Sequence, residues 1–239
     1  MQKNTSRPLF PLFNGFTLKI AMAILMVMDH LYLAFPTRFP AWFHMASRMV
    51  APVFVFLVTE GLVYTRNREA YARRMLVFGL AMWLGNSVLE LLFGTPIRNS
   101  ILISLAISAF IITSLDRAVQ EGRPLYFGVA LALLYLSLFF EGALLCPVIA
   151  LVFYYLRDNR AVMVPAYIAA SFALCKIFFT LPGNSLFAGT QWGMIFAVIP
   201  IVLYGGERGP NGMVAKYFFY LFYPLHIWLI YLWQHIVIV

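Results

Sequence analysis

The chain has 239 residues, of which 63% are apolar and only 11% are charged, and its mean hydropathy is +0.86. Soluble domains carry about 25% charged residues, so this composition argues strongly against a water-soluble globule. A β-barrel is not expected either, because strand-like alternation is missing and helices satisfy their own backbone groups in lipid. We therefore expect an all-α, polytopic integral membrane helical bundle.

Apolar runs of about 17 to 25 residues mark the expected membrane spans. We expect about nine transmembrane helices, with eight or ten as alternatives, in a single transmembrane domain over residues 1–239. Their ranges are 16–36, 42–65, 72–93, 97–115, 124–140, 142–157, 161–181, 189–205 and 215–237. The region 124–157 is the least clearly divided, because Glu141-Gly142 is its only break.

Basic residues are distributed unevenly between the predicted loops. With the N-terminus in the cytoplasm, the inside segments carry Lys3, Arg7, Arg66, Arg68, Arg73, Arg74, Arg117, Arg123, Arg157, Arg160, Arg208 and Lys216. The outside segments carry little more than Arg38 and Arg98, so the positive-inside rule predicts a cytoplasmic N-terminus. The net charge of +8 is then explained by topology and contact with the lipid bilayer, and no nucleic-acid partner is expected.

Asp29 and His30 lie side by side about two-thirds of the way along the first span. An ionised Asp at a helix centre costs about 3 kcal/mol to insert, so such residues face a partner, a cavity or a substrate. At a rise of about 1.5 Å per residue, Asp29 lies about 20 Å from the cytoplasmic edge. The second span enters the bilayer from the outside and carries Arg48 at nearly the same depth, which predicts an Asp29–Arg48 ion pair.

His30 is the first candidate for acid–base chemistry, because an imidazole can accept and then return a proton in one cycle. Neighbours on a helix diverge by about 100°, so Asp29 is not expected to orient His30 directly. The alternative is that Asp29, His30 and Arg48 only form a structural polar clamp between two helices.

His226 lies in the last span, about 15 Å deep when counted from Lys216, and so within a turn of the level of Asp29. Pro224 should kink the helix just before it, and Tyr223 is nearby, as in the wall of a cavity. A satisfied structural histidine is the alternative reading.

The cytoplasmic loop after the second span could contact phosphates through Arg66, Arg68, Arg73 and Arg74. Glu60 lies just above this patch, where it would either serve the site or pair with a local arginine. Lys19 is nearer a helix end, where snorkelling suffices.

Asn99, near the outer end of the fourth span, is a possible hydrogen-bond donor to the site. Cys146 and Cys175 have no CxxC spacing, so neither a metal site nor a disulfide framework is expected.

Several segments together resemble the TraX family, which is named for the acetylase of F-type conjugative pilin. They are Leu18 to His30, Arg48 to Phe54, Thr59-Glu60-Gly61, Thr65 to Arg68 with Tyr71, Asn99, and Lys216 to His226. From about Ile101 to Val214 the match is weak apart from Glu141-Gly142 and Gln191. The resemblance implies an integral membrane acyltransferase that moves acetyl from acetyl-CoA to an amine. It also suggests kinship with membrane enzymes that acetylate sugars.

We therefore expect an acetyl-CoA-dependent, metal-free acetyltransferase of the bacterial cytoplasmic membrane, with an unknown protein or glycan acceptor. His30 would be the general base or carry the acetyl group, with His226 as second candidate. Arg48 would orient Asp29 or stabilise the oxyanion. Binding roles fall to Arg66, Arg68, Arg73, Arg74, Asn99, Glu60 and Tyr223. A proton-coupled carrier and a non-catalytic assembly factor remain alternatives.

Overall fold

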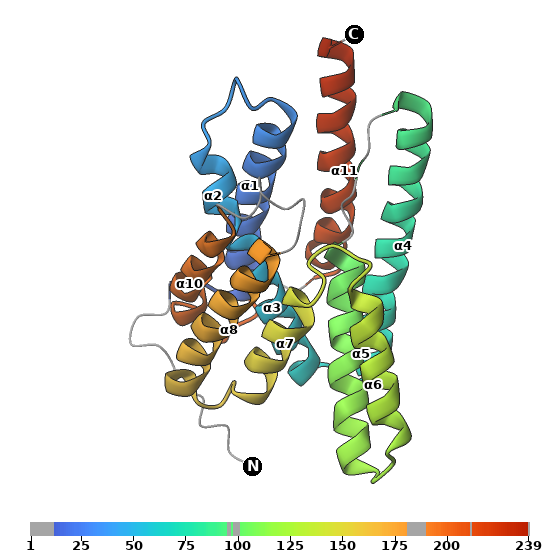
Figure 1. Cartoon of the computed structure of the whole chain (residues 1–239), viewed down its shortest axis with the longest axis vertical. Helices are drawn as coiled ribbons and strands as arrows, with labels where there is room; N and C mark the ends of the chain where they lie inside the picture. Colours follow the sequence, from blue (N-terminus) through green and yellow to red (C-terminus); the bar gives the residue numbers. More distant parts are fainter. Residues whose placement is uncertain (1–11, 95–96, 98–100, 181–189, 211, 239) are drawn as a thin grey trace.

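The computed structural model describes residues 12–94, 97, 101–180, 190–210 and 212–238, and these residues are almost entirely helical. The helices are α1 (Gly15–Ala34), α2 (Trp42–Ser47), α3 (Val50–Tyr64), α4 (Arg68–Phe93), α5 (Ile101–Gln120), α6 (Leu125–Ser137), α7 (Leu145–Tyr155), α8 (Arg160–Thr180), the 3₁₀ turn η1 (Trp192–Ala197), α10 (Val198–Val202) and α11 (Met213–Ile238) (Figure 1). The predicted all-α class is confirmed for this part of the chain.

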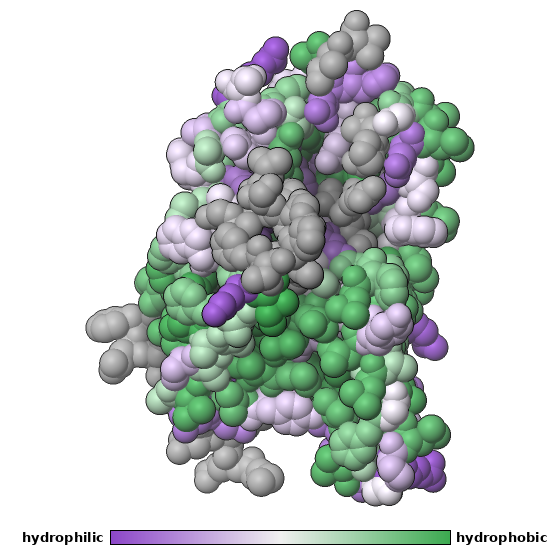
Figure 2. Space-filling model, viewed as in Figure 1, coloured by the Kyte–Doolittle hydropathy of each residue, from purple (hydrophilic) through white to green (hydrophobic). Residues whose placement is uncertain are grey.

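Within the described residues, six helices are long and apolar enough to cross a membrane, which is fewer than the nine predicted. They cover 15–34, 42–64, 68–93, 101–120, 160–177 and 213–237. Apolar residues cover the middle of the face seen in Figure 2, and hydrophilic residues gather mainly toward its two ends.

The other three predicted spans are shorter helices. The ranges 124–140 and 142–157 become α6, with 13 residues, and α7, with 11 residues. At a rise of about 1.5 Å per residue, α7 is about 17 Å long and cannot cross a ~30 Å core. The break between them is wider than the sequence indicated, because α6 already ends at Ser137. Gly142 (φ 80°) and Ala143 (φ 36°) then adopt left-handed conformations just before α7 begins. The range 189–205 becomes the short η1 and α10.

The core is organised around α3, whose sequence is almost continuously apolar. Val53, Val55 and Leu62 of this helix are almost completely buried. It packs against α1, α5, α7, η1 and α10. A helix that is apolar all round is expected in the interior of a bundle, which is the place that α3 occupies.

One tryptophan fixes the last helix, α11, against α4. The Trp228 ring lies against Gly85, where an added Cβ would come within 2.3 Å of it. Its Nε1–H donates a hydrogen bond of 2.8 Å to Oδ1 of Asn86, which is itself buried. This contact holds the segment of α11 that carries His226 in register.

Charged loops gather at the end of the molecule where α1 begins, here called the basic end, to which Arg66, Arg68, Arg117, Arg157 and Arg208 belong. The Asp116 carboxylate accepts hydrogen bonds from Arg68 at 2.5 Å, from Tyr154 at 2.5 Å and from Tyr155 at 3.1 Å. These bonds join α4, α5 and α7.

Replacing Asp116 by Asn should lower the free energy of unfolding by about 1–3 kcal/mol, because the Arg68 guanidinium loses a charged partner that is only 14% exposed. Thermal unfolding in detergent would measure the change. The control Glu121→Gln removes a carboxylate that is 42% exposed at the same end and should shift stability by less than about 0.5 kcal/mol. Equal melting temperatures for the two variants would contradict this role of Asp116.

Candidate functional site

A cavity of about 1030 Å³ lies between α1, α3, α4, α5 and α11. Residues of one face of α1 line it at intervals of three and four, namely Phe16, Lys19, Ala23, Met26, His30 and Leu33. The cavity therefore extends along most of α1, and its two ends differ in chemistry.

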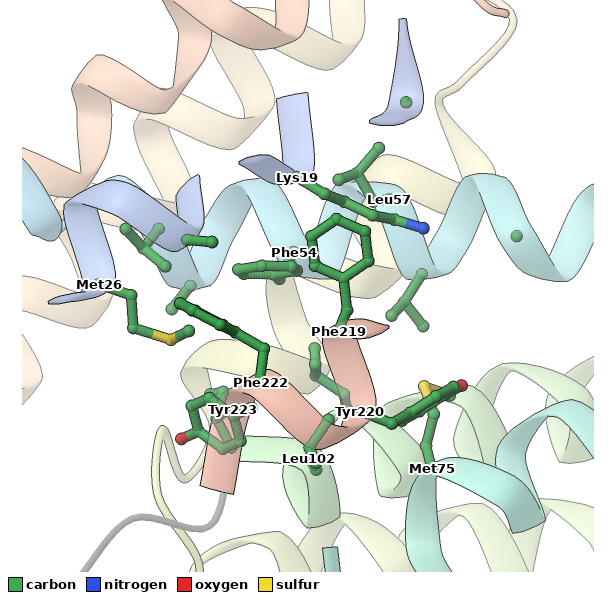
Figure 3. Close-up of a pocket in the computed structure, with 18 of the residues that line it drawn as sticks. Lys19, Met26, Phe54, Leu57, Met75, Leu102, Phe219, Tyr220, Phe222 and Tyr223 are labelled. Carbon is green, nitrogen blue, oxygen red and sulfur yellow. The ribbon is translucent and has the colours of Figure 1, made fainter. Parts of the chain in front are cut away.

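Three parts of the wall can be distinguished. The polar end includes Asp29, His30, Ser47, Arg48, Glu141 and Gln191, and the basic end includes Lys19, Glu60, Arg66, Arg74 and Arg208. Between them the wall is apolar and aromatic, with Met26, Phe54, Leu57, Phe219 and Phe222 (Figure 3).

At the polar end, the Asp29 carboxylate is bound on both oxygens. Nη2 of Arg48 donates to Oδ2 over 2.7 Å, so the predicted Asp29–Arg48 pair is confirmed. Nδ1 of His44 donates to Oδ1, also over 2.7 Å. Because both oxygens are engaged, Asp29 is a poor proton acceptor and acts as an anchor for its two neighbours.

His44 was not predicted as a site residue, although its spacing from Arg48 indicates that the two side chains lie together. His44 precedes Arg48 by four residues, the spacing at which side chains share one face of a helical turn. Arg48 reaches back to the His44 carbonyl through Nε at 3.2 Å, and Ser47 Oγ donates to the same oxygen at 2.7 Å. Nη1 of Arg48 makes no hydrogen bond within the described part of the chain, and Arg48 lines the cavity, so this group can serve a ligand.

His30 and His226 lie together at the polar end, as the depth estimate predicted, with ring centroids 5.3 Å apart. Nδ1 of His226 is 2.7 Å from the Phe222 carbonyl oxygen. Since a carbonyl only accepts, Nδ1 carries the proton and the neutral ring keeps its lone pair on Nε2.

Nε2 of His226 and Nδ1 of His30 are both buried without a hydrogen-bond partner among the described residues. Buried polar atoms in native proteins almost always have a partner, so two orphaned ring nitrogens in one place indicate a catalytic role or a bound polar group. His30 lines the cavity, while His226 lies behind Phe222, whose ring stacks on it at 4.8 Å.

At the basic end, aromatic rings hold the cations that line the cavity. Lys19 Nζ lies 5.5 Å from the Phe219 ring centroid. The guanidinium carbons of Arg74 and Arg208 lie 6.0 Å and 5.2 Å from the rings of Tyr71 and Tyr64. Lys19, predicted to lie near a helix end where snorkelling suffices, also lines the cavity, and Arg208 was assigned from the sequence to an inside segment but not to a site.

The predicted phosphate patch divides into two pairs. Arg66 and Arg74 line the cavity. Arg68 is bound to Asp116, Arg73 is exposed, and neither is among the described residues that line the cavity.

Of the remaining predicted site residues, two line the cavity and one lies outside the described part of the chain. Glu60 lines the cavity and pairs with Arg157 at 3.3 Å, not with an arginine of the adjacent loop. Tyr223 lines the cavity and is 6% exposed. Asn99 lies outside the described residues.

These features define a helical protein of membrane type. Its cavity has a polar end and a basic end, and an apolar stretch of wall lies between them. The family model described as TraX protein matches residues 14–234, and the chain belongs to the TraX family. The probable fimbrial assembly protein FimC, serogroup H1, of Dichelobacter nodosus is 26% identical over 234 residues, covering 90% of this chain and 93% of that protein. No solved structure matches.

Replacing Arg48 by Ala should lower the free energy of unfolding by about 3 kcal/mol, because it leaves a buried carboxylate short of its charged partner. Thermal or SDS-induced unfolding would measure this loss. Arg38→Ala is the matched control, since Arg38 is an exposed arginine whose guanidinium lies over the Phe35 ring and forms no ion pair with a described residue. An Arg48→Ala protein as stable as Arg38→Ala would show that the Asp29 clamp is not needed for folding.

Proposed function

We propose that this protein is an acetyltransferase of the bacterial cytoplasmic membrane, which moves acetyl from acetyl-CoA to an amine or hydroxyl acceptor. The observation that carries the proposal is a pair of buried histidines whose ring nitrogens lack partners among the described residues. His30 lines one end of a cavity with His226 beside it, and cations line the other end. A donor with an anionic head and a distant reactive group matches this distribution of charge.

The basic end is placed in the cytoplasm, as the positive-inside rule predicts. The polar end then lies toward the outer half of the bilayer. Acetyl-CoA would enter from the cytoplasm, and the acceptor would meet the acetyl group near His30.

In the proposed step, the acceptor nitrogen or oxygen attacks the thioester carbonyl while the His30 imidazole takes its proton. The new C–N or C–O bond forms, and Nη1 of Arg48 donates to the developing oxyanion. The C–S bond then breaks, and the proton passes from His30 to the departing thiolate. Asp29 and His44 act as positioning residues, because the Asp29 carboxylate and the His44 backbone carbonyl both accept hydrogen bonds from Arg48.

His226 supports this chemistry from behind His30. Its Nδ1–H is fixed on the Phe222 carbonyl, so its lone pair on Nε2 is available for a proton or a shared water. The two ring centroids are 5.3 Å apart, so the proton taken from the acceptor can be held by either imidazole.

A non-catalytic assembly factor is the second candidate, and the name of the Dichelobacter relative, a probable fimbrial assembly protein, favours it. In that case the polar residues would only lock helices together. The same name makes a pilin-type N-terminal amine a reasonable first acceptor to test, with an envelope glycan as the other.

The test uses purified protein in nanodiscs and acetyl-CoA labelled in the acetyl group. Wild type should release or transfer the label, and His30→Ala should do so about 10²–10⁴-fold more slowly, as expected for loss of a general base. His226→Gln should show a smaller loss.

The control is His235→Ala, because the His235 ring contacts the Phe93 ring at a centroid distance of 4.7 Å and is not among the residues that line the cavity. All variants are compared at matched thermal stability. Label that stays on the protein would identify an acyl-enzyme. If wild type neither binds nor consumes acetyl-CoA, the acetyltransferase proposal fails and the assembly factor becomes the better reading.

A further inference from the structure

We infer that Lys19, Arg74 and Arg208 form a binding site for a diphosphate ester at the basic end of the cavity, with Arg66 at its edge. The site itself stands on the geometry, while the identity of its ligand as the CoA donor rests on the proposed function. Two of the three cations, Lys19 and Arg208, come from segments far from the arginine-rich loop.

The cations of the basic end fall into two groups. Three of those outside the cavity wall are paired with carboxylates, namely Arg68 with Asp116 at 2.5 Å, Arg117 with Glu69 at 2.5 Å and Arg157 with Glu60 at 3.3 Å, while Arg73 is exposed. Those in the cavity wall, Lys19, Arg66, Arg74 and Arg208, form no ion pair with any described residue.

The carboxylate that does line this end is already engaged. Glu60 is bound to Arg157, and both side chains are 13% exposed. The cavity cations rest on aromatic faces instead, which stabilise a cation without neutralising it. The wall of the cavity therefore keeps an excess of positive charge.

This excess is concentrated in a small space. Lys19, Arg74 and Arg208 line the same end of one cavity, and the Arg208 backbone packs against Gly15, one helical turn before Lys19. Nε of Arg74 is buried without a hydrogen-bond partner among the described residues. Like charges assembled in a partly dry site are costly, and an anion would offset that cost.

The fold brings Arg208 to α1 by a specific backbone arrangement. The Gly15 amide donates to the Glu207 carbonyl at 2.7 Å, and an added Cβ at Gly15 would lie 3.2 Å from the Arg208 carbonyl oxygen. Gly209 has φ +69°, and an added Cβ there would lie 2.5 Å from Oδ1 of Asn14, the residue that caps α1. This close approach needs glycine on both sides.

The distance to the reactive centre defines the shape of the ligand. Lys19 and His30 are eleven residues apart on α1, which corresponds to about 16 Å. The passage between them is lined by apolar and aromatic side chains, several of which are drawn in Figure 3. The ligand thus has a diphosphate head and a long uncharged arm. A nucleotide-linked thioester has this chemistry, and so does a membrane lipid diphosphate.

The first experiment compares two acetyl donors, acetyl-CoA and S-acetylpantetheine, of which only the former carries the diphosphate. Lys19→Met and Arg208→Gln should each raise the KM for acetyl-CoA about tenfold or more. They should leave kcat/KM for S-acetylpantetheine within about twofold, because the arm and the polar end are untouched. Arg208→Lys should recover part of the loss, and the exposed Arg123→Gln is the control.

The second experiment measures binding without turnover, as thermal protection in zwitterionic nanodiscs by CoA or by a polyprenyl diphosphate. Protection by CoA that is lost in Lys19→Met and Arg208→Gln supports the site and its donor, even if wild type shows no transfer and the proposed function fails. Protection by the lipid diphosphate alone, lost in the same variants, supports the site and removes CoA as its ligand.

Two results would overturn the inference. One is a wild type that neither diphosphate protects. The other is a set of folded variants whose kcat/KM falls equally for acetyl-CoA and S-acetylpantetheine, since the cations would then not bind the diphosphate.

Discussion

The structure depends on the neutralisation of one carboxylate, Asp29, in the middle of an apolar helix. A buried carboxylate needs a charged partner and further hydrogen bonds, which Arg48 and His44 supply on its two oxygens. Both partners come from the chain that returns after α1, so the short α2 and the start of α3 must pack back against α1. This return creates the polar end of the cavity and places His30 on its wall. Folding and site assembly therefore share the same interaction.

The last helix completes the site because its position is fixed independently. Trp228 ties α11 to α4 through Asn86 and Gly85, beyond the apolar part of the cavity. His226 is thereby held 5.3 Å from His30, and its own tautomer is set by a carbonyl of its helix. An imidazole fixed in this way loses little freedom when it takes part in a reaction, which is the preorganisation that catalytic groups need.

The sequence predicts the polar end well and the basic end less well, for a physical reason. Depth along a helix follows from residue counting, so Asp29, Arg48 and His226 could be placed at one level before their contacts were known. Counting says nothing about partners that tertiary packing brings together, such as Arg68 with Asp116 across 48 positions. Nor does it reveal which face of α1 lines a cavity, and Lys19 was not predicted as a site residue for that reason. The helix count was too high because hydrophobicity alone does not show how long a helix is, and the apolar segments 125–137, 145–155 and 192–202 form helices shorter than the other spans.

Buried charge is neutralised at the polar end of the cavity and left uncompensated at its basic end. This difference is compatible with a group-transfer site. At the polar end the protein neutralises its own Asp29, so a reacting carbonyl would meet the His30 imidazole and the Arg48 guanidinium. At the basic end the cations that face the cavity keep their charge uncompensated within the described residues. Binding energy gained there, far from the reacting atoms, can hold a substrate arm in the apolar passage and place its end beside His30. Remote binding energy of this kind accelerates a reaction when it is used to position the reacting group.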